Sequence, residues 1–317
     1  MLYHVTFIAT LATLASSHGV VTSIQGANGV VMPGLSIADG TPRDCSSNRC
    51  GSQADTSIIR DREMSENGPL GRTQGNGPVL AETMISNFMG TGSAPTNNGA
   101  NDSVGVEDDI PQNNQKRGIR EKRQLRNLLG GLFGGGGGGG GSGGGNGGGG
   151  ATGLGGLLGG GGDSNDGPPE ASVAQSAGAG QSDGLPTCSD DGTISLTYRQ
   201  INQDGAGPLD AAVDGTSGGT DPDAFQNAEV TQDVPGLGIQ GLSLATNTDF
   251  PVEVQMPAGM TCDATVAGVD NVCIVRVRNG AAAGPFGGSA AFTQSAASRK
   301  RAIAYRLKKR MEIGNRK

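Results

Sequence analysis

The sequence predicts an all-β protein with the architecture of a β-sandwich, and two observations support this prediction. Several short stretches alternate apolar and polar residues with a period of two, which is typical of strands that bury one face. Turn-forming segments separate these stretches, since the chain holds 59 Gly and 15 Pro residues. Short strands joined by turns, with no long helix between them, favour a sandwich over other layer architectures.

The first predicted strand covers residues 20–25, where Val20, Thr22 and Ile24 alternate with Val21, Ser23 and Gln25. Further strands are predicted in the second half of the chain, at residues 194–199, 252–256 and 273–278. We expect each of these strands to have one buried and one solvated face.

A short helix is predicted near residue 80. Pro78 suits its first turn, and Leu80, Met84 and Phe88 fall on one side of it.

A low-complexity stretch divides the domain. Most of residues 92–185 are Gly, Ser, Asn, Asp, Gln or basic residues, and they include an unbroken glycine run at 134–141. Glycine loses much backbone entropy when it is ordered, so this stretch is predicted to be a disordered linker. Residues 18–91 and 186–296 then form the two parts of one sandwich domain, which a tail at 297–317 follows.

The N-terminal residues 1–17 are predicted to be a signal peptide. Residues 5–15 are apolar and uncharged, but they are too few to span a bilayer, which needs roughly 20 residues. Small residues at 15–17 suit a signal peptidase. The alternative is a short buried strand at an uncleaved end. Cleavage after Ser17 would make His18 the first residue of a secreted, extracellular protein.

A terminal histidine is a candidate metal ligand. The free amine and the imidazole of His18 could chelate one ion, and copper binds such nitrogen ligands most tightly. A third ligand is required, and removal of His4 leaves no second histidine in the mature chain. The alternative is that His18 is the first residue by chance.

The five cysteines fit an extracellular protein. Cys45–Cys50 and Cys262–Cys273 would close short loops and are the favoured disulfides, which leaves Cys188 over, although spacing alone does not fix the pairing. No pair has the C-x-x-C spacing of zinc sites.

Charge is concentrated at the end of the chain. Nine Lys and Arg residues stand against Glu312 in 298–317, although the whole protein has a net charge of −7. An acidic body argues against nucleic-acid binding, which needs a basic face on the folded domain.

Ile303, Leu307 and Met311 recur every four residues, which predicts a basic amphipathic helix suited to anionic membranes or polysaccharides. Proteolytic trimming of the tail and a solvated extension are the alternatives. No apolar segment long enough to span a membrane follows the domain.

Two kinds of modification site lie in the predicted linker. Asn101 begins an N-glycosylation sequon. The pairs Lys116-Arg117 and Lys122-Arg123 resemble kexin-type processing sites, with cleavage after Arg117 and Arg123. The alternative is a solvated run of charges.

Other polar groups are assigned to structure. Asp39, Asp44 and Asp55 near Arg43 are predicted to form a network of ion pairs in a loop. The paired Asp residues elsewhere stand among Gly and Pro, where Asp usually forms turns, which disfavours a glycosidase. Aromatic residues, at 3%, are too few and scattered for a sugar-stacking platform.

Several motifs carry a resemblance to a known family. They are H-G-V-V-T-S-I-Q-G-A-N-G-V (18–30), G-T-P-R-D-C (40–45), Q-A-D-T-S-I-I-R-D-R-E (53–63), G-R-T-Q-G-N-G-P (71–78), Q-I-N-Q-D-G-A-G-P (200–208) and V-C-I-V-R-V-R-N-G-A-A-A-G-P-F-G-G (272–288). In this order they resemble the Egh-like (Gas-like) family of secreted fungal proteins, which are associated with appressoria and host penetration. The family is similar in fold to lytic polysaccharide monooxygenases, which implies an immunoglobulin-like β-sandwich and a copper ion held by an N-terminal and a second histidine.

The sequence departs from that pattern at the second ligand. The resemblance implies a histidine where this chain has Arg199, and a guanidinium cannot ligate copper. Relatives are also expected to carry cysteines near Ala211 and Ser289, and their joint absence suggests one lost disulfide.

We therefore expect a non-catalytic virulence protein at the fungal surface, with chitin, glucan, cellulose or the host surface as partner. One alternative is a copper-dependent enzyme that cleaves polysaccharide oxidatively at a site of His18 and a carboxylate. Another is a membrane- or wall-associating module that acts through the tail.

Overall fold

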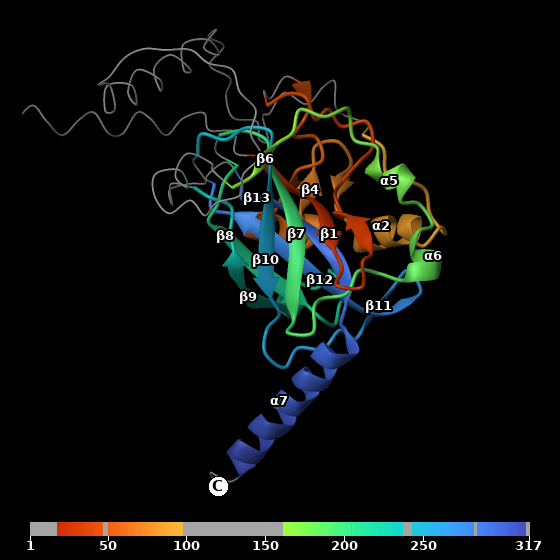
Figure 1. The fold of residues 1–317 in the computed structure, drawn as a ribbon, viewed down its shortest axis with the longest axis vertical. Coiled ribbons are helices and arrows are strands. Elements are labelled where there is room, and N and C mark those ends of the chain that lie inside the picture. The colour runs from red at the N-terminus through yellow and green to blue at the C-terminus, as the bar shows by residue number, and fades with distance from the viewer. Residues whose placement is uncertain are drawn as a thin grey trace, which may run out of the picture. The chain divides into compact units, whose positions relative to one another are not determined.

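The computed structural model describes residues 18–46, 50–97, 161–203, 205–236, 243–281 and 284–314. Its elements are mostly strands, as predicted (Figure 1). The strands are β1 Gly19–Gln25, β2 Val31–Pro33, β3 Ser57–Ile58, β4 Arg72–Thr73, β5 Gly77–Pro78, β6 Asp163–Ser164, β7 Thr193–Gln200, β8 Leu209–Asp214, β9 Phe225–Gln232, β10 Thr248–Gln255, β11 Ala264–Val266, β12 Val269–Asn279 and β13 Phe286–Thr293. The helices are α1 Met64–Asn67, α2 Ala81–Phe88, α5 Ser172–Gln175, α6 Gly180–Asp183 and α7 Ala296–Gly314, with short 3-10 turns at Asp61–Glu63 and Pro222–Ala224.

The strands are ordered β2-β1-β7-β10-β9-β8-β12-β13-β3-β4-β5, and the pairs along this path are antiparallel. β9 pairs with both β10 and β8, so the sheet continues around it from one layer to the other. The two layers face each other where Gly288 of β13 meets Val21 of β1, because a Cβ on Gly288 would lie 2.7 Å from the Val21 nitrogen. The all-β sandwich is confirmed.

One large apolar core fills the space between the layers, and Ile58, Ala281 and Phe286 form a second, small cluster. The large, fully buried side chains of the main core come from β1, α2, β7, β10, β12 and β13, on both sides of the long insertion. β7 and β10 follow the predicted alternation, with Ile194, Leu196 and Tyr198 buried on one and Val252 and Val254 buried on the other. Residues before and after the insertion therefore share one core.

Two strands differ from the simple alternation. In β1 the register shifts between Val21 and Ser23, a β-bulge that turns both Val20 and Val21 into the core. In β12 both faces are buried around Ile274 and Arg276, whereas one solvated face was predicted. The reason is a covering segment, because Arg276 donates to the Pro69 carbonyl at 2.7 Å from this second face.

The predicted short helix is α2, which begins at Ala81 rather than near Pro78. Met84 and Phe88 are fully buried, as expected, but Leu80 is 56% exposed because it is the N-cap residue and has left the helical face. Asn87 donates to the Val173 carbonyl at 3.0 Å and so joins α2 to α5.

The segment 161–185 was expected to belong to the disordered linker, and that expectation is wrong for these residues. They form β6, α5 and α6, and β6 pairs with β10. Asp39 accepts the Val173 and Ala174 N–H groups at 3.0 and 2.8 Å and thereby caps α5 from the first part of the chain. The linker prediction now concerns residues 98–160, which lie outside the described residues.

Candidate functional site

His18 enters the fold at the start of β1 and is only 1% exposed. Its carbonyl accepts the Ile201 N–H at 3.0 Å, which extends the ladder between β1 and β7. Its backbone nitrogen donates to Asn202 Oδ1 at 2.7 Å, and its ring Nδ1 lies 3.1 Å from Asn202 Nδ2. The ring also packs against Phe286, with centroids 4.6 Å apart. His18 is thus a packed residue of the sandwich.

This arrangement bears on the copper hypothesis. The two His18 nitrogens that would chelate an ion both face the single amide of Asn202. Among the residues that the structure describes, no group of three or more His, Cys, Asp and Glu side chains is placed to hold a metal ion. Asn202 therefore engages both of these His18 nitrogens in this structure, and copper binding at His18 stays a prediction.

Arg199 stands at the expected position of the second histidine, and its guanidinium is buried and hydrogen-bonded to three other segments. The β1–β7 register places it opposite Val20, and its side chain is 3% exposed. It donates to the Arg43 and Asn165 carbonyls, both at 2.6 Å, and to Asp249 at 3.2 Å. Burial lowers the pKa of Arg199 below its ordinary value, although Asp249 opposes this shift. The guanidinium joins three segments that are distant in sequence.

The predicted loop network around Arg43 is confirmed for Asp55. Arg43 Nη1 and Nη2 donate to the two oxygens of this fully buried carboxylate at 3.1 and 2.6 Å. Arg43 also binds Glu170 Oε2 through Nε at 3.1 Å and through Nη2 at 2.9 Å. Asp39 instead caps α5, and Asp44 is exposed. Glu170 was not predicted as a partner of Arg43, because it lies in the stretch 92–185 that was expected to be a disordered linker.

Electrostatics favour the charged forms of Arg43 and Glu170. Burial opposes ionisation of Glu170, but the charge of Arg43 and the hydrogen bonds from Ser172 outweigh it and leave the pKa of Glu170 below its ordinary value. Burial alone would lower the pKa of Arg43, whereas Asp55 and Glu170 raise it well above the ordinary value. Arg43 therefore joins the segments that carry Asp55 and Glu170.

Both predicted disulfides are confirmed. Cys45–Cys50 and Cys262–Cys273 have Cα atoms 6.4 and 4.9 Å apart. Cys188 is free and buried, and this burial raises the pKa of its thiol. Within the described residues, Cys188 belongs to no group of three or more His, Cys, Asp and Glu side chains that could hold a metal ion.

The inferred pairing of cysteines near Ala211 and Ser289 is wrong for these positions. Ala211 lies opposite Val277 in β8, and Ser289 lies opposite Arg276 in β13, so β12 runs between them. Two strand spacings amount to about 9–10 Å. This separation exceeds the roughly 7 Å that a disulfide tolerates between Cα atoms.

Aromatic side chains do not form a platform on the described surface. Tyr198, Phe88, Phe250, Phe286 and Phe292 are all buried, and Phe225 is half-buried beneath the Arg276 guanidinium at 4.5 Å. Tyr305 is the exposed exception among the described aromatic residues, with 44% of its surface exposed. The expectation that the aromatic residues are too scattered to stack on sugars agrees with this placement.

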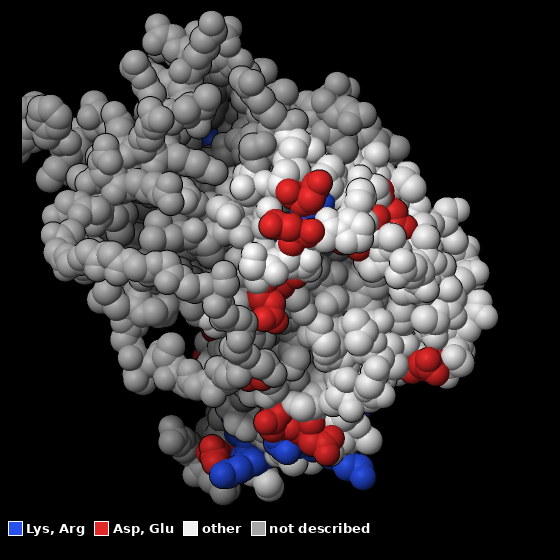
Figure 2. Space-filling model, turned by 45° about the horizontal axis from the view of Figure 1, so that its top comes forward, with Lys and Arg blue, Asp and Glu red and all other residues white. Residues whose placement is uncertain are grey.

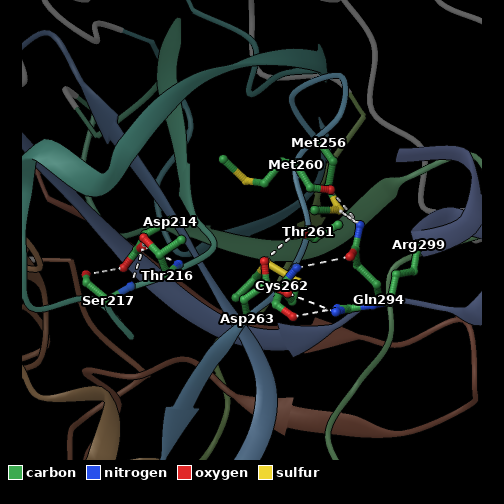
Figure 3. The surroundings of a disulfide bond; sticks show 11 residues. Asp214, Thr216, Ser217, Met256, Met260, Thr261, Cys262, Asp263, Gln294 and Arg299 are labelled. Carbon is green, nitrogen blue, oxygen red and sulfur yellow. Dashed lines mark hydrogen bonds and ion pairs between the residues drawn. A yellow bond between two sulfur atoms is a disulfide. The ribbon is translucent and has the colours of Figure 1, made fainter. Parts of the chain in front are cut away.

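The predicted tail helix is α7, and its root is fixed to the body (Figure 3). Ser298 and Ala302 are buried, and Arg299 donates to the Cys262 carbonyl at 2.7 Å and to Asp263 at 2.9 Å. Beside this root, Gln294 donates to the Met260 carbonyl and accepts the Cys262 N–H, both at 3.0 Å. The Cys262–Cys273 disulfide thus fixes the loop that receives the helix.

Beyond its root, α7 extends away from the strands (Figure 1). Ile303, Leu307 and Met311 are 45%, 53% and 64% exposed, and they form the apolar row that the four-residue spacing predicted. Seven basic residues share the helix with this row: Arg299, Lys300, Arg301, Arg306, Lys308, Lys309 and Arg310. Figure 2 shows basic side chains gathered at this end of the molecule, while acidic side chains predominate over the visible body. No described helix is long and apolar enough to cross a membrane.

Other predicted sites lie outside the described residues. These are the signal peptide at 1–17, the sequon at Asn101 and the processing sites at Arg117 and Arg123. They remain predictions. Asn202, by contrast, was missed as the partner of His18, although it stands in the motif Q-I-N-Q-D-G-A-G-P that was already singled out.

Comparison with known proteins identifies the relatives. Residues 16–287 match the family described as Egh16-like virulence factor. The chain is 49% identical over 304 residues to the appressoria-specific virulence factor GAS2 of Pyricularia oryzae, which covers 95% of this chain and 92% of that protein. It is 37% identical over 129 residues to GAS1 of the same fungus, covering 39% and 50% of the two chains. No solved structure matches. The chain therefore belongs to the Egh16-like virulence factor family.

Proposed function

We propose that this chain is a secreted, non-catalytic contact protein of an infecting fungus and that α7 attaches it to an anionic surface. Its relatives are named appressoria-specific virulence factors, which supports action where the fungus meets its host. The observation that carries the proposal is the exposed row of Ile303, Leu307 and Met311 among seven basic residues on a helix anchored at one end.

The energetics favour such a contact. Each Lys or Arg near an anionic membrane surface contributes about 1 kcal/mol, and each buried apolar side chain adds to this. A basic helix of this length is marginal alone in water. In this chain, however, Ser298, Arg299 and Ala302 fix the first turns to the body, so less ordering entropy opposes binding.

Cell-wall polysaccharide is the second candidate partner, as the family resemblance suggests. The buried aromatic residues leave little stacking surface on the sandwich, so chitin, glucan or cellulose would be bound through polar groups and through Tyr305. The contact would then be weaker than that of an aromatic platform. Oxidative cleavage is not proposed, because Asn202 engages both His18 nitrogens that would chelate the ion.

The test uses the full-length chain and a variant that ends at Ala302, so that the root of α7 is retained. Both are mixed with phosphatidylcholine vesicles, with the same vesicles containing 30% phosphatidylserine, and with insoluble chitin, glucan and cellulose. We expect binding to the anionic vesicles alone, with a loss of at least about 100-fold in the truncated variant, because six basic residues, one acidic residue and the apolar row are removed. Equal binding of both variants would contradict the role of α7, and retention on a polysaccharide would favour the second candidate.

A further inference from the structure

The parts of the chain before and after the insertion are interleaved in one sheet. β1 and β2 of the first part extend one edge through the β1–β7 pair, which is aligned over six residue pairs. β3, β4 and β5 extend the opposite edge through β13. Because strands of one part complete the sheet of the other, each part would expose long unpaired edges if it were alone.

Buried polar contacts also cross between the two parts. Glu170 of the second part binds Arg43 of the first, and its side chain is 14% exposed. Asp39 caps α5 through two backbone N–H groups. From the opposite direction, Arg199 donates to the Arg43 carbonyl and Arg276 donates to the Pro69 carbonyl. These contacts fix the register and orientation of the parts, while the shared core provides their affinity.

No disulfide among the described residues crosses between the parts. Cys45–Cys50 lies within the first part, and Cys262–Cys273 lies within the second. The covalent connection between them is therefore the stretch 98–160. Such a covalent connection raises the effective concentration of one part for the other.

We propose that residues 18–97 and 161–317 are a self-associating fragment pair, which stays folded when a peptide bond between them is hydrolysed. Hydrolysis consumes one water and leaves a new carboxylate on the first chain and a new amine on the second. Processing after Arg117 or Arg123 would then produce a two-chain protein with the complete sandwich. The first chain would carry His18, and the second would carry α7.

The experiment introduces a recognition sequence for a specific protease into the glycine run at 134–141 of the full-length chain. After complete cutting, we expect one species at micromolar concentration in size-exclusion chromatography, two bands on a denaturing gel without reductant, and an unchanged far-ultraviolet spectrum. The unfolding temperature of the cut protein should fall on dilution, because its folding has become bimolecular. Two separated species, or loss of the β-sheet spectrum on cutting, would overturn the proposal.

A matched pair of variants locates the interface. Glu170→Gln removes a charge that crosses between the parts, whereas Glu63→Gln removes a carboxylate whose partners Arg60 and Arg72 lie in the same part. In the cut protein, we expect Glu170→Gln to weaken association by about 10- to 100-fold, because hydrogen bonds to charged groups are lost. Glu63→Gln should weaken it by less than about 3-fold. If Glu170→Gln does not fold, Asp39→Asn tests the same interface through α5. Equal effects of the crossing and control variants would overturn this assignment.

Discussion

The two ends of the described chain are built in opposite ways. His18, at the beginning, is 1% exposed, and its nitrogens face the side chain of Asn202. At the other end, Leu307 and Met311 of α7 are more than half exposed. His18, the candidate metal ligand, is therefore a packing residue. The exposed apolar side chains lie on α7, which follows the part of the chain that matches the family, residues 16–287. The proposed contact function rests on this difference.

Asp214, Arg43 and Arg199 of the body, like His18, make hydrogen bonds that hold segments of the fold in place. Asp214 accepts backbone N–H groups from Thr216, Ser217 and Gly219 at 2.7–2.9 Å, and so shapes the turn after β8. Figure 3 shows Asp214 with Thr216 and Ser217. Arg43 and Arg199 likewise join distant segments. In the described body, strong polar interactions thus stabilise long loops, which an all-β sandwich with short strands needs.

The largest expected effect is on surface binding by α7. Replacing Ile303, Leu307 and Met311 together with Ser should weaken binding to anionic vesicles by about 30- to 100-fold, because roughly 2–3 kcal/mol of apolar burial is lost. The free energy of unfolding should change by less than about 0.5 kcal/mol, since these side chains are exposed. Vesicle co-sedimentation and urea unfolding measure the two quantities. Val31→Ser, at an exposed apolar position of β2, is the control, and an equal loss there would refute the assignment.

The next effect concerns the buried end. Asn202→Ala should lower the free energy of unfolding by about 1–3 kcal/mol, because the His18 nitrogens lose their amide partner inside the protein. Asn227→Ala, at an exposed position on β9, should change it by less than about 0.5 kcal/mol. Urea unfolding of both variants decides the matter. Equal stability of the two would show that the His18 environment is not structural.

Acid should weaken the body through two carboxylates. Burial opposes the ionisation of Glu170 and Asp214, yet Arg43 and the hydrogen bonds to Asp214 leave both pKa values below their ordinary range. A pKa depressed in the folded state gives stability that is complete above the unfolded-state value near pH 4 and is lost as the pH falls through the folded-state value. Urea midpoints should therefore fall between pH 5 and pH 3. The difference between the parent protein and Glu170→Gln should shrink over the same interval, and a constant difference would contradict this explanation.

The smallest effect is expected at the root of α7. A hydrogen bond from Thr261, together with Arg299, lowers the pKa of Asp263. Both members of the Asp263–Arg299 pair are more than a third exposed, so Asp263→Asn should cost less than about 1 kcal/mol. The buried thiol of Cys188 reports on this region, because it interacts with Ser298. Its labelling by a thiol reagent should be faster in the variant than in the parent protein, and an unchanged rate would indicate that the pair does not hold the root.

Sequence patterns predicted the elements whose cause is local. β7 and β10 have clean alternation, α7 has an apolar row with a four-residue spacing, and both disulfides close short loops. The missed features depend on distant partners. The bulge in β1 arises from its pairing with β7, and the second buried face of β12 exists because a loop near Pro69 covers it. Glu170 and α5 stand in a polar, glycine-rich context, and only Arg43 and Asp39 give them a fixed place.

Copper titration of correctly processed, full-length protein, followed by electron paramagnetic resonance, tests the contrast between the two ends most directly. If His18 is a packing residue held by Asn202, the protein should not bind near-stoichiometric copper below micromolar concentration. The electron paramagnetic resonance spectrum of the Asn202→Ala variant should likewise show only weakly bound copper. One tightly bound copper per chain, with a nitrogen-rich spectrum that is lost in His18→Ala, would contradict the account.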